Sequence, residues 1–289
     1  MSVRVCSKIV RGQSSVDGAG VHLQRVLGYR TIKDFDPFLM LDGFDSVDPE
    51  DYIKGFPWHP HRGIETVTYL ITGEIEHGDS LGNSGIIGPL GCQWMTAGSG
   101  IIHQEMPLAS KRMLGCQLWV NLPKDMKMTE PAYRDIKEKD VAVIREERAV
   151  VRVLSGKYRG IEGAVTGDYV KVNFLDVDLQ PDTIWSYDEI SNDQTLFLYL
   201  IEGSIAADEA LIKFEERACA ILMSTSTPES DGFDKIITKA GSQGARFFLI
   251  AAKPLKEPIS WGGPIVMNTK EELDIAFEEL DNNTFIKHK

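Results

Sequence analysis

Short runs of apolar and β-branched residues, separated by glycine-containing turns, recur along the chain. They follow one another too closely for helices to lie between them, which is typical of antiparallel strands. One run ends at Thr72-Gly73 and resumes directly after the glycine, which indicates a hairpin or a tight corner. The middle of the protein is therefore predicted to be almost entirely β. The expected strands lie at residues 65–71, 74–76, 93–95, 115–120, 150–154, 169–179, 196–201 and 246–250.

Two segments depart from this rhythm. Residues 121–148 contain Pro123, Pro131 and many charged side chains, which favours a linker carrying a short helix. Near the end of the chain, Thr269 and Glu272 have the spacing of a capping box, so a C-terminal amphipathic helix is predicted. The apolar residues that follow with helical periodicity are Leu273, Ala276, Phe277 and Leu280.

An internal repeat points to two related β units in tandem. The phrase Tyr69-Leu-Ile-Thr-Gly-Glu-Ile75 returns beyond the predicted linker as Tyr199-Leu-Ile-Glu-Gly-Ser-Ile205. Each half has the size of one small β-barrel or jelly roll, closed architectures that hide the edges of short antiparallel strands. We predict an all-β protein with one domain at residues 1–135 and a second at residues 136–289, the second ending in the amphipathic helix.

Composition and charge exclude several classes of function. The chain has 289 residues, 43% of them hydrophobic and 26% charged, which are ordinary values for a globular protein of about two domains. Its net charge of −12 repels phosphate backbones, so nucleic acid is not expected as a direct ligand. Neither a signal-peptide core nor an apolar run of about 20 residues occurs, so we expect an intracellular protein without a membrane anchor. The four cysteines are widely spaced, which indicates neither a disulfide framework nor a thiolate zinc site.

Three of the six histidines lie in two short phrases that suit a metal ion, His59-Pro60-His61 and His103-Gln104-Glu105. Alternate residues of a strand point to the same face, so each phrase sends two side chains in one direction. Three imidazoles and one carboxylate result. This donor set is typical of a divalent first-row metal such as iron, with one or two coordination positions open for a substrate.

Other interpretations of these residues stay open. A single His-x-His phrase is more often a set of surface or hydrogen-bonded histidines than a metal site, and the second phrase shifts the balance towards metal. Glu65 has the same parity as His59 and His61, which makes it a rival to Glu105 as the carboxylate ligand. His22 and His77 are expected mainly at the surface.

The second half of the chain lacks this chemistry. No histidine occurs between residues 104 and 287, although the repeated phrase is kept in both halves. Since imidazole is the donor on which the first site depends, the second domain is predicted to be a support or an interaction surface.

Several phrases identify a family. Asp36-Pro-Phe-Leu39 and the motifs around the candidate ligands lie in order along nearly the whole chain. These motifs are Gly55-Phe-Pro-Trp-His-Pro-His-Arg-Gly63, Gln93-Trp-Met-Thr-Ala-Gly98, Gly100-Ile-Ile-His-Gln-Glu-Met-Pro107 and Gly263-Pro-Ile-Val-Met-Asn-Thr269. Together they resemble the pirin family. Gly43 stands where pirins usually carry a larger residue, so the pocket wall can differ there.

The resemblance implies a bicupin, two tandem cupin barrels with an iron site in the N-terminal one. It implies His59, His61, His103 and Glu105 as the iron ligands, which favours Glu105 over Glu65. Other divalent first-row metals would suit the same donors.

The resemblance also implies a metal-dependent dioxygenase of the quercetinase type, acting on a flavonol and O2. The adjacent hydroxyl and carbonyl oxygens of the flavonol would chelate the open metal positions, and Glu105 would take the hydroxyl proton as the catalytic base. Apolar side chains near the ligands are candidates for a flat pocket, although core packing is the expected role of Trp94. These candidates are Phe56, Trp58, Trp94 and Met106.

Two alternatives belong to other classes of function. Pirins are also described as iron- and redox-dependent co-regulators of transcription, which would here act through contacts with a protein partner in the cytoplasm or the nucleus. The chain's acidity agrees with protein contacts rather than direct contact with DNA. The second alternative is a cupin that binds or isomerises a small sugar or acid, with zinc or manganese bound by the same ligands.

Overall fold

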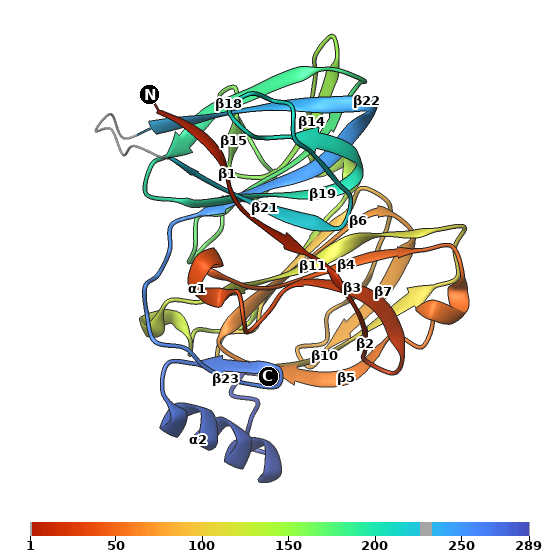
Figure 1. The fold of residues 1–289 in the computed structure, drawn as a ribbon. Coiled ribbons are helices and arrows are strands. Elements are labelled where there is room, and N and C mark those ends of the chain that lie inside the picture. Colours follow the sequence, from red (N-terminus) through yellow and green to blue (C-terminus); the bar gives the residue numbers. More distant parts are fainter. Residues whose placement is uncertain (1, 226–232, 289) are drawn as a thin grey trace. The chain divides into compact units, whose positions relative to one another are not determined.

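The computed structural model describes residues 2–225 and 233–288, and it confirms the predicted strand-rich fold (Figure 1). The chain forms two compact units, each assembled from separate segments. The N-terminal unit comprises residues 13–32, 37–138 and 255–289, and the C-terminal unit comprises residues 1–12, 33–36 and 139–254. Among the residues that the structure describes, no helix has the length and apolar composition needed to cross a membrane.

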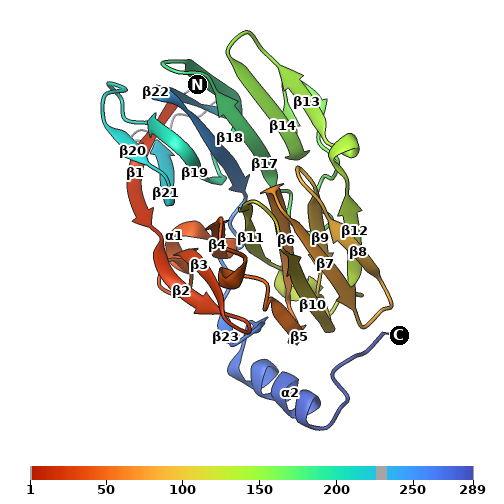
Figure 2. The same ribbon diagram turned by 90° about the vertical axis from the view of Figure 1, so that its right-hand side faces the viewer.

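The N-terminal unit contains two main sheets, visible in the lower part of Figure 2. The seven-stranded sheet has the order β12-β9-β6-β11-β4-β3-β2, and the four-stranded sheet has the order β5-β10-β7-β8. The strands are β2 (Gln13–Asp17), β3 (Val21–Leu27), β4 (Phe38–Ser46), β5 (Phe56–His61), β6 (Ile64–Thr72), β7 (Glu74–Asp79), β8 (Ser84–Ile87), β9 (Cys92–Thr96), β10 (Ile101–Leu108), β11 (Met113–Asn121), β12 (Ala132–Ile136), β23 (Ser260–Gly262) and β24 (Ile265–Met267). The helical elements are η1 (Pro49–Asp51), η2 (Lys124–Met126) and α2 (Lys270–Asp281).

Gly73 forms the corner between these two sheets. Strand β6 belongs to the seven-stranded sheet and β7 to the four-stranded one, so the chain changes sheets at this glycine rather than closing a hairpin. Gly73 has a φ of 95°, a conformation that a side chain disfavours. Of the two sequence-based alternatives, the tight corner is therefore correct.

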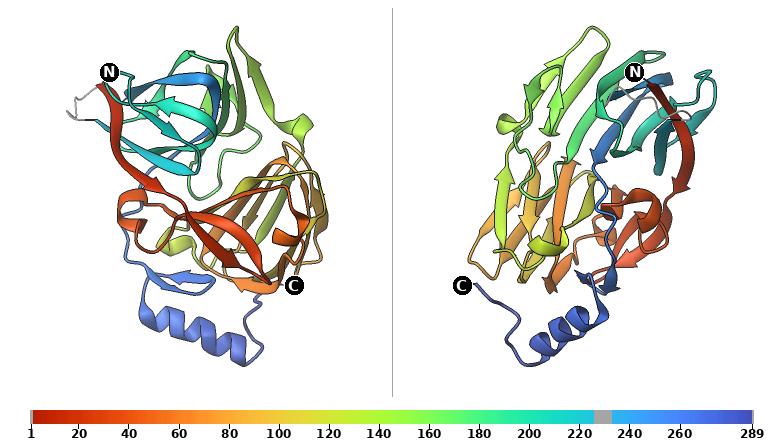
Figure 3. Two further views of the ribbon diagram at one scale, coloured as in Figure 1. Left: turned by 45° about the vertical axis from the view of Figure 1, so that its right-hand side comes forward. Right: turned by 90° about the vertical axis from the view of Figure 1, so that its left-hand side faces the viewer.

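The C-terminal unit is a second curved β structure around its own core (Figure 3). Its large sheet has the order β13-β14-β17-β22-β1-β21-β19-β20, and β18 also pairs with the long strand β22. The strands are β1 (Ser2–Arg11), β13 (Ala142–Arg145), β14 (Ala149–Ser155), β15 (Lys157–Tyr158), β16 (Ile161–Glu162), β17 (Asn173–Leu179), β18 (Ile184–Ser191), β19 (Thr195–Ala206), β20 (Phe214–Glu216), β21 (Cys219–Thr225) and β22 (Phe233–Ala252). The short helical elements are α1 (Ile32–Phe35) and η3 (Glu138–Asp140).

The core of this unit is apolar and aromatic. Trp185 and Tyr187 are buried, their rings are nearly parallel at 1°, and Tyr158 stacks beside both. Gly203, the counterpart of Gly73 in the repeated phrase, also has a positive φ, of 73°, and it interrupts the pairing of β19 with β22. The repeat thus preserves a glycine with positive φ in both units, while the interior of the C-terminal unit is filled by hydrophobic packing.

Two expectations about the chain's organisation need revision. The segment 121–148 is not a linker with a short helix, because it contains strands β12 and β13 beside the single-turn elements η2 and η3. Strand β12 extends the seven-stranded sheet by pairing with β9, and this pairing outweighs the charged composition from which a linker was predicted. The contact-based units also differ from a single cut at residue 135, because β1 joins the C-terminal unit and residues 255–289 join the N-terminal one.

The predicted C-terminal helix is confirmed as α2, beside β23 in Figure 2. Its N-terminus carries the capping box: the Thr269 hydroxyl accepts from the Glu272 N–H, and the Glu272 carboxylate accepts from the Thr269 N–H. Ala276 is fully buried, Leu273 and Leu280 pack around Phe285, and Phe277 is 38% exposed. The apolar face therefore attaches the end of the chain to the N-terminal unit.

Lys127 fastens three segments of the N-terminal unit together. Its buried ammonium donates to the carbonyls of Gly63 and Val266, at 2.8 and 2.9 Å, and to Asn121 Oδ1 at 2.7 Å. Burial lowers the pKa of this ammonium to about 7. Since Gly63 follows the His59-x-His61 phrase and Val266 lies in the C-terminal segment, this one side chain joins the two.

We predict that Lys127→Met lowers the free energy of unfolding by about 3 kcal/mol at pH 7, because three buried acceptors lose their donor. The pKa of Lys127 is lower in the folded chain than the ordinary 10.5, so between pH 7 and 10 the folded state releases a proton that the unfolded state keeps. The stability of the wild type relative to the variant should therefore increase as the pH rises from 7 to 10. Urea denaturation at several pH values measures both effects.

Lys171→Met is the matched control, because Lys171 is exposed and donates to a single carbonyl, that of Gly167. It should change the free energy of unfolding by less than about 0.5 kcal/mol. Equal losses in the two variants would contradict the structural role of Lys127.

Candidate metal centre

Strands β5 and β10 bring the three histidines together through their register. They pair antiparallel, with His59 opposite His103 and His61 opposite Ile101. Strand β10 alternates strictly between buried and half-buried positions, which turns His103 and Glu105 into the interior. The alternation predicted from sequence therefore holds along β10, and the ladder supplies the pairing with β5 that sequence could not.

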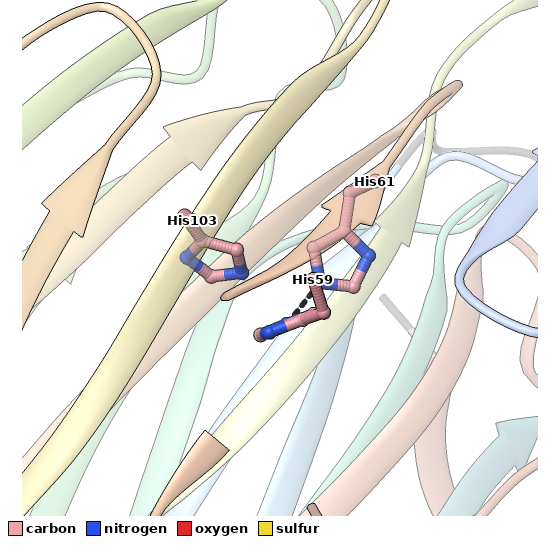
Figure 4. Close-up of side chains that lie close together, drawn as sticks. All are labelled: His59, His61 and His103. Atoms are coloured by element: carbon pink, nitrogen blue, oxygen red, sulfur yellow. Dashed lines mark hydrogen bonds between the residues drawn. The ribbon is translucent and has the colours of Figure 1, made fainter. Parts of the chain in front are cut away.

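The imidazoles of His59, His61 and His103 converge (Figure 4). Each offers a ring nitrogen within 4.8 Å of those of the other two. The Nδ1 atom of His59 lies 2.8 Å from the Pro57 carbonyl, and that of His61 lies 3.0 Å from the Pro264 carbonyl. Because a carbonyl only accepts, both Nδ1 atoms carry a proton, so each ring in its neutral form presents a lone pair at Nε2. These two Nε2 atoms face each other at 3.0 Å.

The environment keeps two of these rings neutral. Burial, together with a smaller effect of the neighbouring His59, lowers the pKa of His61 to about 3. Burial also lowers the pKa of His103 well below 6.5, with smaller effects from the other histidines. Within the described part of the chain, neither ring nitrogen of His103 has a hydrogen-bond partner. Neutral imidazole is the form that binds metals, and converging lone pairs repel unless a cation lies between them. The donor set thus fits a divalent metal.

The two carboxylates proposed as ligands both lie inside the unit but make other contacts. Glu105 is buried; its Oε1 accepts from the Thr68 hydroxyl at 3.0 Å and its Oε2 from the Gln117 amide at 2.7 Å. The rival Glu65 accepts from the Thr96 hydroxyl at 2.7 Å. Among the described residues, the converging group contains the three histidines without either carboxylate. The β5–β10 register shifts between His103 and Glu105, which offsets Glu105 from the histidine row.

The C-terminal segment of the N-terminal unit, residues 255–289, is hydrogen-bonded to the residues that follow His61. The Val266 N–H donates to the Arg62 carbonyl, and Gly63, with a φ of 76°, lies so close to Val266 that a Cβ there would be 2.0 Å from its carbonyl oxygen. The buried Arg62 donates to the Ser99 and Phe285 carbonyls, pairs with Glu279 of α2 and lies over the Phe285 ring. These bonds hold Pro264 where its carbonyl orients His61.

A pocket of about 580 Å³ opens at His59 and His61. Of the four predicted lining residues, Phe56 lines it, but Trp58, Trp94 and Met106 do not: Trp58 is 55% exposed, whereas Trp94 is buried in the core. Sequence reasoning missed residues far along the chain from the histidines, because strand pairing brings them there. They include Arg25, Asp42, Gln117, Trp119 and Trp261.

One histidine was misplaced. His22 is exposed as expected and pairs with Asp51 at 3.2 Å, but His77 is buried. It lies on the inward face of the alternating strand β7, opposite Glu105. Its ring stacks on that of Tyr133, with 4.7 Å between the ring centroids and 15° between the ring planes. The alternation of 74–79 was the signal that could have placed it.

Comparison with known proteins agrees with this architecture. The family model of pirin matches residues 20–120, and that of the pirin C-terminal cupin domain matches residues 174–286. The chain is 40% identical to a pirin-like protein of Caulobacter vibrioides, over 99% of this chain and 100% of the relative, and 37% identical to human pirin, over 96% and 91%.

Among solved structures, quercetin 2,3-dioxygenase from Acinetobacter baumannii is similar, with a TM-score of 0.85 and 28% identity. The likeness covers 98% of this chain and 99% of that one. The two β units are therefore the two cupin domains of a bicupin. Because the likeness to pirin relatives extends over the whole chain, the protein belongs to the pirin family.

Proposed function

We propose that this protein is a metal-dependent dioxygenase that cleaves flavonols such as quercetin, with iron as its metal. The observation that carries the proposal is the convergence of the His59 and His61 Nε2 atoms and the His103 ring beside an aromatic pocket. The similarity to the Acinetobacter quercetin 2,3-dioxygenase supports the choice of substrate.

His59, His61 and His103 would hold the metal, and Glu105 is the proposed fourth ligand. A bound divalent metal would supply Lewis acidity and open positions for two adjacent substrate oxygens. Pro57 and Pro264 hold the Nδ1 protons of His59 and His61, which keeps both Nε2 atoms directed at the site.

The remaining residues bind the substrate and move one proton. Trp119 and Trp261 provide apolar surface that excludes water from one side of the pocket. Glu105 is the proposed base for the flavonol hydroxyl. Gln117 lines the pocket and donates to Glu105 Oε2, and this oxygen keeps a second lone pair that would take the proton of the flavonol hydroxyl. The Thr68 hydroxyl holds the other carboxylate oxygen in place.

The first prediction concerns the metal. Protein purified without added metal should contain close to one divalent first-row ion per chain, and its iron-loaded form should consume O2 with quercetin. His103→Ala should weaken metal binding at least about 100-fold, because a ligand is removed from a site where even supporting residues contribute 10–100-fold. Elemental analysis by mass spectrometry and an oxygen electrode measure these outcomes.

His22→Ala is the matched control, since His22 is exposed in the same unit and away from the converging group. It should bind metal and turn over as the wild type does. A wild-type protein that binds no divalent metal would overturn the proposal, and iron binding without turnover would remove the dioxygenase assignment.

The second prediction separates the two carboxylates. Glu105→Gln should lower kcat at least about 100-fold, as expected when a general base is removed, with little change in melting temperature. Glu65→Gln, which changes an equally buried carboxylate bonded to Thr96, should keep most of the activity. The reverse ranking would assign the role to Glu65, and equal rates in all three proteins would exclude both. The alternative of a redox-dependent co-regulator of transcription stays a prediction.

A further inference from the structure

The pocket beside the histidines has two chemically different walls. One wall is aromatic. The ring of His61 lies edge-on to that of Trp119, with 5.0 Å between the ring centroids. The centroids of Trp119 and Trp261 are 5.9 Å apart, and those of Trp261 and Tyr29 are 6.0 Å apart. A volume of about 580 Å³ is typical of sites for small organic ligands. This wall offers flat apolar surface to a planar ring system.

A second part of the pocket wall is a charged cluster of Asp17, Arg25 and Asp42. Arg25 binds Asp42 with two parallel hydrogen bonds, Nε to Oδ1 at 2.9 Å and Nη2 to Oδ2 at 2.7 Å. Its Nη2 also donates to Asp17 Oδ2 at 2.7 Å. The Asp42 side chain is 4% exposed, whereas those of Arg25 and Asp17 are 34% and 49% exposed. A planar guanidinium held in this way has a fixed orientation.

Strand register connects this cluster to the interior. Arg25 lies directly opposite Asp42, and Asp42 lies directly opposite Gln117, across three neighbouring strands. Directly paired residues share one face of a sheet, so these side chains form a polar row that ends at the bond from Gln117 to Glu105. The charged wall is therefore built into the same sheet face as the proposed base.

The charge balance of the cluster is negative. One guanidinium and two carboxylates leave a net charge of −1, and the carboxylate oxygens, each already holding one hydrogen bond, have further acceptor capacity. Among the described residues, none accepts a hydrogen bond from Arg25 Nη1, so the wall also offers donors. A neutral hydroxyl can donate to one group and accept from the other, whereas an anionic substituent is repelled by the excess carboxylate.

We infer that the Asp17–Arg25–Asp42 cluster is a specificity site that selects planar aromatic ligands bearing neutral hydroxyl groups and rejects those bearing an anionic group. This inference rests on the proposed function for the identity of the ligand class. It adds that the peripheral hydroxyls, rather than the metal-binding oxygens, are recognised by this wall.

A binding experiment under nitrogen tests the inference without turnover. The iron-loaded protein is titrated with quercetin and with quercetin-5′-sulfonic acid, which differs by one sulfonate, and quenching of tryptophan fluorescence reports binding. The wild type should bind quercetin at least about tenfold more tightly than the sulfonate, because like charges in a partly desolvated pocket repel. His59→Ala should weaken both ligands, which places them at this pocket.

Variants of Asp17 then test the cluster itself. Asp17 is exposed, so substitution leaves the fold intact. The preference is the Kd of the sulfonate divided by the Kd of quercetin. Asp17→Asn should lower this ratio about threefold and Asp17→Lys about tenfold, mainly because the sulfonate binds more tightly. Glu50→Gln is the matched control, since it removes one exposed carboxylate from the same unit outside the pocket and should leave the preference unchanged.

The outcomes separate this inference from the proposed function. Quercetin that binds without being oxidised in air, with the expected shifts at Asp17, would support the specificity site and reject the dioxygenase. Turnover in air with an unchanged preference in Asp17→Lys would keep the dioxygenase and overturn the specificity site. Equal shifts in Asp17→Asn and Glu50→Gln would also overturn it, because they would reduce the effect to the overall charge of the protein.

Discussion

Two imidazole nitrogens that face each other at 3.0 Å are the constraint around which the N-terminal unit is built. Burial opposes a positive charge on His61 and His103 and lowers the pKa of both. A divalent cation would instead be shared by all three converging rings. The buried surroundings of His61 and His103 thus disfavour the protonated state that would compete with metal.

Such an arrangement persists only if the backbone holds the rings against their mutual repulsion. The antiparallel ladder of β5 and β10 fixes His59 opposite His103, and a carbonyl from the far end of the sequence fixes the tautomer of His61. Arg62 and Lys127 then bind the C-terminal segment to the strand that carries these ligands. The end of the chain is therefore part of the site, and its buried hydrogen bonds offset the cost of burying polar groups.

The sequence allowed the β class, the tandem repeat, the capped helix and the three histidines to be predicted, since each follows from local periodicity or spacing. It could not reveal Trp261 or Pro264 beside His61, because that contact depends on long-range pairing of the C-terminal segment. The strand β12 was missed for a similar reason: its partner β9 stabilises a segment whose own residues favour a loop. His77 was misplaced although its strand alternates, because its polarity was given more weight than its parity.

The two units share a repeated backbone feature but differ in the side chains of their interiors. Both keep a glycine with positive φ at the same place in the repeat, at Gly73 and Gly203. The interior of the C-terminal unit is packed with apolar side chains around Trp185. The N-terminal unit has apolar clusters of its own, but it also buries three histidines and two carboxylates at and beside the converging group, and these contribute little to stability by themselves. Metal binding favours the folded state over the unfolded one, so the stability of the N-terminal unit is expected to depend on its ligand in a way that the C-terminal core does not.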